Sequence, residues 1–232
     1  MKLTKTLTLI SIALILQISL SGCAKNMVLK RLIRENPEAK VGIAIEAMPT
    51  PSAHKKGTMG LLDMEISASM NSFLREHLEE TDCSPFLNIK EKLAARVHAG
   101  GLKPIIIDDF IDVESLPKIK NRKKRTSPID FSSIAQKYDV DYILLLKMDA
   151  VGTVHYFFGF IPMGAPSAYC VAGGLLVQGK TNEKYWSYIM DPGKSQVRIE
   201  EKWNNPPEYS ELDTAIQKAI TKAVTEVETN FN

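Results

Sequence analysis

Cysteine is scarce in this sequence, and neither sign of charge is in large excess. The chain has 232 residues but only three cysteines, and no two of them form a Cys-x-x-Cys pair. Three cysteines are too few for a disulfide-rich scaffold or for a structural zinc site with four cysteine ligands. The 29 basic and 27 acidic residues leave a formal net charge of +2, whereas nucleic-acid-binding domains usually carry a clear basic excess. The composition therefore argues against a disulfide-rich scaffold, a four-cysteine zinc site and a nucleic-acid-binding domain.

Catalytic signatures are also missing. The sequence contains no Gly-x-Ser-x-Gly elbow, phosphate-binding loop, His-Glu-x-x-His zinc motif or Gly-x-Gly-x-x-Gly turn. The four histidines, His54, His77, His98 and His155, lie far apart along the chain. We therefore predict no catalytic residue, no metal site and no cofactor, and we expect the protein not to be an enzyme. A hydrolase of envelope polymers is the less favoured alternative.

The first 23 residues have the features of a targeting segment. Lys2 and Lys5 precede an apolar run of 14 residues, Leu7–Leu20. This run is shorter than the roughly 20 apolar residues that a membrane-spanning helix needs. It ends in Leu20-Ser21-Gly22-Cys23. These four residues resemble the lipobox of bacterial lipoproteins, and the resemblance implies cleavage before Cys23 and lipid modification of its side chain.

The lipobox resemblance also implies a location and a domain division. Residue 24 is Ala rather than Asp, which in Gram-negative lipoproteins implies sorting to the outer membrane, with the chain facing the periplasm. We expect a signal peptide at residues 1–22, a lipidated tether at 23–40 and a single periplasmic domain at 41–232. Cleavage removes Lys2 and Lys5, so the mature chain has equal numbers of basic and acidic residues.

Hydrophobic periodicity predicts an α/β domain. Short runs rich in β-branched residues predict buried strands, and apolar residues three and four positions apart predict helices. The expected strands are 41–46, 104–108, 140–148, 169–178 and 183–190, and the expected helices are 62–80, 87–97, 131–138 and 212–227, with a loop at 48–60. Strands that alternate with helices favour parallel pairing, whereas the last two strands form a hairpin. We predict a mixed sheet of about five strands, parallel in its first part, with flanking helices and a C-terminal amphipathic helix.

One segment resembles a group of periplasmic lipoproteins. Residues 134–144 read Ile-Ala-Gln-Lys-Tyr-Asp-Val-Asp-Tyr-Ile-Leu, and a strand hairpin containing Trp186 and a last helix follow. Ala135, Asp141 and Tyr142 match a helix-to-strand pattern of the α/β lipoproteins related to the curli-secretion lipoprotein, the penicillin-binding-protein activator lipoproteins and the amino-terminal domain of TolB. The resemblance implies an α/β fold. Because a fold does not fix a function, the function has to be argued from particular surfaces.

An aromatic segment is the first candidate for a binding surface. Residues 151–168 are rich in aromatic residues, Pro and Gly, which disfavours a regular helix. An apolar loop of this kind either covers the sheet or is exposed, and exposed apolar patches mark interfaces or membrane contacts. We predict that it binds a partner, and the alternative is that it belongs to the core. The predicted partner-binding residues are Phe157, Phe158, Phe160, Ile161 and Met163.

A basic segment at residues 118–125 is the second candidate surface. Six of its eight residues are cationic, and such clusters attract phosphate-bearing headgroups or an acidic protein face. The alternative is a solvated loop without a partner. The predicted anionic-surface residues are Lys118, Lys120, Arg122, Lys123, Lys124 and Arg125.

Two thiols, Cys83 and Cys170, are left once Cys23 carries lipid. Cysteine pairs often bridge in the oxidising periplasm, but the sequence does not show whether their Cα atoms approach each other closely enough. A disulfide between Cys83 and Cys170 and two buried free thiols are therefore both open.

These features together predict an outer-membrane lipoprotein that faces the periplasm and acts by binding. We expect an accessory or assembly factor of an envelope complex in transport, secretion or cell-wall synthesis. Acyl chains on Cys23 would hold it in the outer membrane, and it would contact an unidentified envelope protein. The alternative is a structural lipoprotein whose aromatic segment joins identical copies into a ring. Nucleic acid is not an expected partner.

Overall fold

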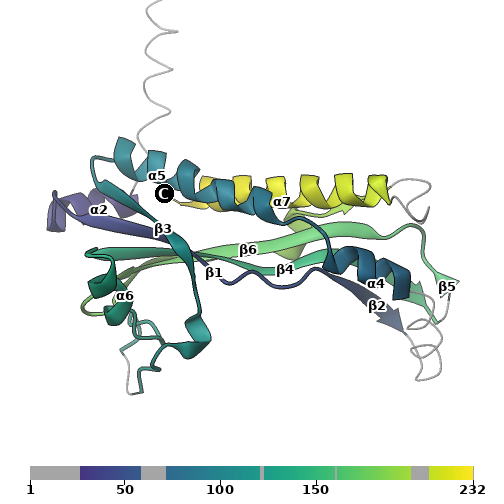
Figure 1. The fold of residues 1–232 in the computed structure, drawn as a ribbon, viewed down its shortest axis with the longest axis horizontal. Helices are drawn as coiled ribbons and strands as arrows, with labels where there is room; N and C mark the ends of the chain where they lie inside the picture. The colour runs from purple at the N-terminus through teal and green to yellow at the C-terminus, as the bar shows by residue number, and fades with distance from the viewer. Residues whose placement is uncertain (1–26, 59–71, 121–122, 160, 200–208, 232) are drawn as a thin grey trace, which may run out of the picture.

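The domain is built on one mixed sheet with helices on both of its faces (Figure 1). The computed structural model describes residues 27–58, 72–120, 123–159, 161–199 and 209–231. The strands are β1 (Lys40–Glu46), β2 (Ser52–Thr58), β3 (Lys103–Ile111), β4 (Tyr142–Phe158), β5 (Ile161–Pro162), β6 (Ser167–Gln178), β7 (Lys184–Ile189) and β8 (Val197–Arg198). The α-helices are α2 (Met27–Glu35), α4 (Ser72–Glu79), α5 (Ile89–Ala99), α6 (Ser132–Lys137) and α7 (Ser210–Asn230), with 3₁₀ turns at Ser84–Asn88, Val113–Ser115 and Pro192–Lys194.

Eight strands of the described chain form the sheet. Five of them lie side by side in the order β3-β1-β4-β6-β7. The strands β3, β1 and β4 pair in parallel, whereas β4, β6 and β7 pair antiparallel. This confirms the predicted α/β class, its parallel first part and its closing hairpin. The three further strands β2, β5 and β8 correct the predicted number of five. The expected loop at 48–60 contains β2, whose polar sequence carries no buried-strand signal.

β4 is far longer than the sequence suggests. It has 17 residues and continues through the aromatic stretch that we expected to be irregular. Its second half pairs in parallel with β2 on one side and antiparallel with β6 on the other. Gly152 allows this close pairing, because it has a φ of +138° and a Cβ there would lie 1.9 Å from the carbonyl oxygen of Ser52. β4 and β6 thus extend the sheet to a distal end beyond α7.

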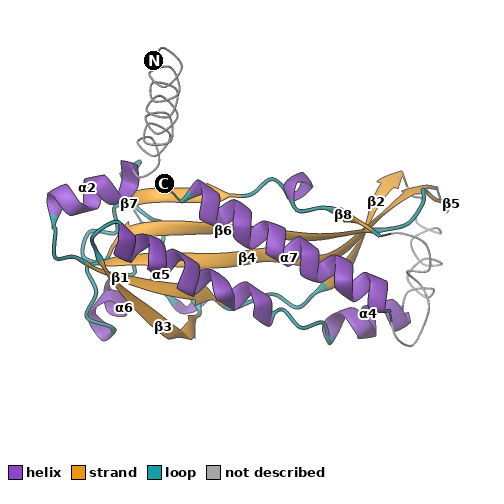
Figure 2. Ribbon diagram, turned by 90° about the horizontal axis from the view of Figure 1, so that it is seen from above, coloured by secondary structure: helices purple, strands orange, loops and turns teal. Residues whose placement is uncertain are grey.

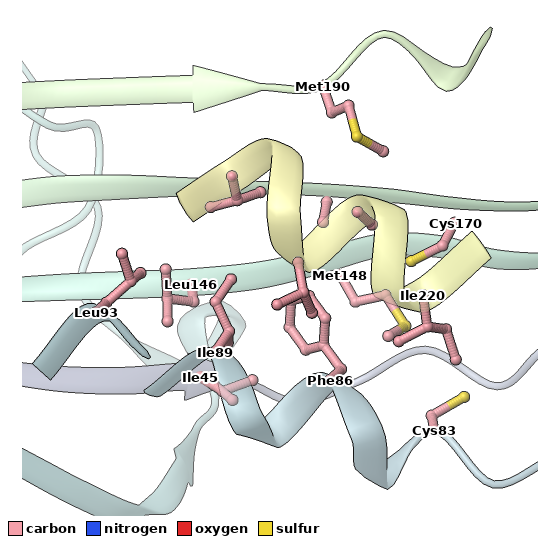
Figure 3. Packing of buried hydrophobic residues seen from close by; sticks show 14 of the residues in the cluster. Ile45, Cys83, Phe86, Ile89, Leu93, Leu146, Met148, Cys170, Met190 and Ile220 are labelled. Carbon is pink, nitrogen blue, oxygen red and sulfur yellow. The ribbon is translucent and has the colours of Figure 1, made fainter. Parts of the chain in front are cut away.

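Two cores hold the layers together. Helices α2, α5 and α7 cover one face of the sheet, and α6 covers the other face near one end (Figures 1 and 2). The larger core lies under α2, α5 and α7 and includes Phe86, Leu93 and Ile220 (Figure 3). The smaller core joins Phe131 to Ile143 under α6. The predicted stripe of the last helix is buried: Leu212, Ala215, Ile216, Ala219, Ile220, Ala223, Val224 and Val227.

α2 lies within the predicted tether and packs firmly on the domain. Leu29 and Leu32 are almost fully buried in the larger core. The guanidinium carbon of Arg31 lies 4.2 Å from the ring centroid of Tyr185 on β7. Part of the predicted tether is therefore a fixed helix of the domain.

Several sequence predictions fall outside the described residues. They are the signal peptide at 1–22, the lipidated Cys23 and most of the expected helix at 62–80. Within the ranges that the structure describes, no helix combines the length and the hydropathy needed to cross a membrane.

Acid should weaken the attachment of α2 through Glu35. Hydrogen bonds from Tyr185 and then from Arg31 lower the pKa of Glu35 below its usual range. A lowered folded-state pKa contributes stability that is present above the unfolded value of about 4.3 and is lost as the pH falls through the folded value. We expect Glu35→Gln to lower the urea midpoint at neutral pH, and this difference from wild type to disappear in acid. The control Glu76→Gln changes an exposed residue of α4 and should not change the urea midpoint. If the difference in midpoint between Glu35→Gln and wild type is the same in acid as at neutral pH, the proposed role of Glu35 is wrong.

Candidate functional site

The aromatic segment forms the exposed distal end of the sheet, which we call the tip. The tip consists of Tyr156 and Phe158 at the end of β4, Ile161 of β5 and Met163 after it (Figure 1). Their exposed fractions are 38%, 68%, 53% and 61%. The structure therefore places Phe158, Ile161 and Met163 at the surface rather than in the core. Tyr156 belongs to the same aromatic segment but is not among the predicted contact residues, although strand alternation places it on the same face as Phe158.

Phe157 supports the tip from the other face of β4. Its side chain is half-buried, and its ring centroid lies 4.7 Å from that of His155. The ammonium of Lys55, on β2, lies 5.8 Å from the same Phe157 ring centroid. Phe157 thus differs from the exposed Phe158 beside it. Phe160, the remaining predicted residue, lies outside the described residues.

Backbone contacts fix the tip to β4. Gly159 follows β4 with a φ of +59°, a conformation that glycine adopts at little cost. The amide of Met163 donates to the carbonyl oxygen of Tyr156 at 2.8 Å. The Nε2 atom of His155 lies 2.7 Å from the carbonyl oxygen of Gly164. Ile161 and Met163 are therefore carried on backbone that is hydrogen-bonded to β4, which lowers the entropy cost of binding.

The strands at the end of the sheet that carries the tip bear basic residues. The described residues of β2, β5, β8 and the second half of β4 include Lys55, Lys56 and Arg198, and they include no Asp or Glu. Burial lowers the pKa of Lys55 and also that of His155. An apolar surface with a cationic rim is complementary to an apolar pocket with an acidic or polar rim.

The basic segment lies at the opposite end of the molecule from the tip. Lys118, Lys120, Lys123, Lys124 and Arg125 are all exposed, and Arg122 lies outside the described residues. The ends of the segment are fixed, since Lys118 forms a β-bridge with Ile129 and the neighbouring Thr126 forms one with Glu183. The two candidate surfaces of the sequence are therefore separate sites.

An open recess of about 580 Å³ lies beside the end of β3, between Phe110, Leu116 and Ile134. Its carboxylate Asp109 accepts hydrogen bonds from the Tyr138 hydroxyl and from Lys137. These contacts lower the pKa of Asp109. A carboxylate held ionised in this way suits a structural ion pair better than a general acid, whose pKa should lie near the working pH.

The histidines do not gather into one constellation. The Nε2 atom of His77 lies 2.7 Å from the Asp213 carboxylate, and that of His54 lies 3.0 Å from the Ser52 hydroxyl. Nucleophilic catalysis needs a base that is in turn oriented by a third group. Among the residues with described positions, no cluster of three His, Cys, Asp or Glu side chains is arranged to hold a metal ion.

Cys83 and Cys170 are free thiols, and both belong to the larger core (Figure 3). Both are buried, with exposed fractions of 8% and 0%. Burial raises the pKa of Cys170 to about 12 and also raises that of Cys83. The structure thus corresponds to the second alternative, two buried free thiols. Because the thiolate is the reactive form, both should be inert in the folded protein.

A thiol titration checks this arrangement. We expect the folded, acylated protein to react negligibly with a disulfide-exchange reagent at about pH 8, and to release two equivalents after unfolding without reductant. Rapid reaction in the folded state would contradict the burial of these thiols. Two equivalents that appear only after reduction would show that Cys83 and Cys170 form the disulfide.

The comparisons with known proteins assign no family. No protein-family model matches the sequence, and no curated protein matches it. Among solved structures, hypothetical protein CT253 from Chlamydia trachomatis is 9% identical with a TM-score of 0.34, covering 84% of this chain and 98% of its own. Lipoprotein GNA1162 from Neisseria meningitidis is 12% identical with a TM-score of 0.29, covering 81% and 99%. The LpoB C-terminal domain from Salmonella enterica is 12% identical with a TM-score of 0.23, covering 74% and 93%. The function therefore has to be inferred from the surface of this chain.

Proposed function

We propose that this protein is an outer-membrane lipoprotein that faces the periplasm and binds another envelope protein through the tip. It acts without catalysis, as an accessory or assembly factor of a transport, secretion or cell-wall complex. The observation that carries the proposal is the presence of four exposed apolar side chains on and next to the paired strands β4 and β5.

The physical cost of this surface supports a binding role. Fully burying a side chain such as Phe, Ile or Met contributes about 1.5–3 kcal/mol relative to leaving it exposed. The exposed Phe158, Ile161 and Met163 contribute little of this to folding. Aromatic residues and Met are also enriched at protein interfaces. The free energy of burying these side chains is therefore gained only when a partner covers them.

The anchor supports a location near the membrane. The lipobox resemblance at Leu20–Cys23 implies acyl chains on Cys23. One acyl chain holds a protein only weakly, whereas several chains anchor it stably. A stable anchor would confine the protein to the space beside the outer membrane, which raises the effective concentration of the tip for partners in that space.

Site-specific photo-crosslinking in intact cells tests the proposal. A photoreactive phenylalanine analogue is placed at Phe158, and the matched control carries it at Phe110. Phe110 is also an exposed aromatic residue, with a fraction of 50%, but it lies on β3, away from the tip. We expect a discrete adduct with a different protein at position 158 and none at position 110.

The other outcomes identify the alternatives. An adduct of two identical chains at position 158 would favour the ring-forming structural lipoprotein. Adducts with lipid alone would assign the tip to a membrane instead. The same protein crosslinked at both positions would show that the tip is not the specific contact.

A further inference from the structure

We propose that the anchored end of the domain is a second membrane contact, a cationic surface that binds the anionic phospholipid headgroups of the membrane holding the acyl chains. This cationic base consists of Lys30, Arg34, Lys123, Lys124, Arg125 and Lys180. The proposal rests on the proposed lipidation of Cys23, but it does not depend on what the tip binds.

The fold brings together basic segments that are far apart in the sequence. Arg31 of α2 contacts the carboxylate of Glu183, just before β7, at 3.1 Å. The amide of Lys184 donates to the carbonyl oxygen of Arg125 at 2.7 Å, and Thr126 forms a β-bridge with Glu183. α2 and the basic segment therefore meet at the β6–β7 turn. Figures 1 and 2 place this end of the sheet opposite the tip.

Positive charge exceeds negative charge on the three segments that meet here. Residues 27–35, 123–130 and 178–185 contain eight Lys or Arg residues but only three acidic ones. The three acids are already engaged, Glu35 and Glu183 with Arg31, and Asp130 with Asn182. Within the described chain, no residue of the cationic base forms an ion pair. Because the mature chain is balanced as a whole, this excess is local.

The short connection to the anchor places this charge near lipid. Three residues, 24–26, separate Cys23 from Met27, the first residue of α2. Cys23 and Met27 are four Cα steps apart and therefore lie at most about 14 Å from each other. The Debye length is about 8 Å at physiological ionic strength, so α2 begins within two Debye lengths of the anchor. α2 cannot easily be drawn away from the domain, because Leu29 and Leu32 are buried. Its exposed residues are Met27, Lys30, Arg34 and Glu35. One of them is apolar, two are cationic and one is acidic, and all four lie next to the anchor.

Anionic headgroups are the occupant that these features fit. Phosphate-bearing lipids lie where the tether ends, and each Lys or Arg near an anionic surface raises binding about fivefold. β4 is about 55 Å long at the usual rise per residue. A base held against the membrane would therefore direct the tip away from that membrane, toward proteins in the periplasm.

Fluorescence quenching on vesicles tests the orientation. The acylated protein with Pro128→Cys is labelled at that exposed position with a fluorophore; the native Cys83 and Cys170 are buried and Cys23 carries lipid. It is reconstituted into vesicles of phosphatidylcholine alone or mixed with phosphatidylglycerol, with a quencher on the headgroups. We expect strong quenching only with phosphatidylglycerol, and little quenching of a label at Met163→Cys. Raised salt should remove the effect, and inorganic phosphate at equal ionic strength should do no more than salt.

Charge reversal supplies the matched control. The variant Lys30→Glu, Arg34→Glu, Lys180→Glu should lower the ratio of docked to undocked protein by at least about tenfold. The variant Arg75→Glu, Lys218→Glu, Lys222→Glu changes the net charge equally at exposed residues outside both the base and the tip, and it should behave like wild type. Equal quenching on both vesicle types, equal effects of both variants, or stronger quenching at position 163 would overturn the proposal. Intact mass shows whether each protein carries acyl chains, which separates a failure of lipidation from a failure of the base.

Discussion

The combined substitutions Phe158→Ser, Ile161→Ser and Met163→Ser are expected to lower the affinity for the partner captured at the tip by at least about a hundredfold. Each side chain contributes about 1.5–3 kcal/mol when it becomes fully buried, and each 1.4 kcal/mol is a factor of ten in affinity. The three residues expose more than half of their surface in the free protein. Burial of the exposed parts of all three side chains would contribute about 2.7–5.5 kcal/mol, and a hundredfold change corresponds to about 2.8 kcal/mol. Titration of the purified partner, once crosslinking has identified it, measures the change.

The same variant should fold as well as wild type. Surface substitutions that break no packing usually change stability by about 0.5 kcal/mol or less. The control Phe110→Ser removes a similarly exposed aromatic side chain elsewhere and should leave affinity unchanged. If the tip variant binds normally while its melting temperature is unchanged, the tip is not the binding surface. If it unfolds instead, these side chains have a structural role that their exposure does not indicate.

Gly152→Ala is expected to be the most destabilising change of a single methyl group. The added Cβ would lie 1.9 Å from the Ser52 carbonyl oxygen, and the φ of +138° is one that alanine rarely adopts. We expect a loss of about 3 kcal/mol from this strain and clash. For a chain of this size that corresponds to a fall of roughly 6–12 °C in melting temperature. Because Gly152 joins β2 to the distal half of β4, partner binding at the tip should fall as well.

A comparison of Gly152→Ala with Gly159→Ala separates the destabilisation caused by the steric clash from that caused by backbone strain. Gly159 also has a positive φ, +59°, but no atom of the described residues lies within 4 Å of the position that a Cβ would occupy. Alanine there should cost only about 1 kcal/mol. Calorimetry on both variants gives the comparison. Equal losses would show that the close approach of β2 and β4 has no energetic role.

Much of the fold could be predicted because apolar periodicity is a local signal. The buried strands β1 and β6 and the stripe of α7 follow from the spacing of their own residues. β2 could not be predicted in this way, since its sequence Ser-Ala-His-Lys-Lys-Gly-Thr is polar and becomes a strand only by pairing with β4. Pro and Gly near the aromatic stretch also suggested irregular structure, whereas the glycines instead form the close β2 contact and the turn at the tip.

The residues of the candidate sites could be predicted from the sequence, but their arrangement in space could not. The density of aromatic residues identified the tip, yet only pairing across the sheet decides that Phe158 is exposed while Phe157 packs under Lys55. The position of the basic segment beside α2 depends on contacts with Glu183, more than 50 residues away in the chain. Short-range patterns carry no information about such contacts.

The oxidation rate of Met163, compared between intact envelopes and the purified protein, tests directly whether a partner covers the tip. Met163 is 61% exposed, whereas Met148 and Met190 are buried and serve as internal references that should react slowly in both samples. Hydrogen peroxide oxidises accessible Met residues, and peptide mass spectrometry gives the rate at each position. If a partner covers the tip, Met163 should react rapidly in the purified protein and much more slowly in envelopes. Equal rates in the two samples would mean that nothing covers the tip in the envelope, which contradicts the proposed function.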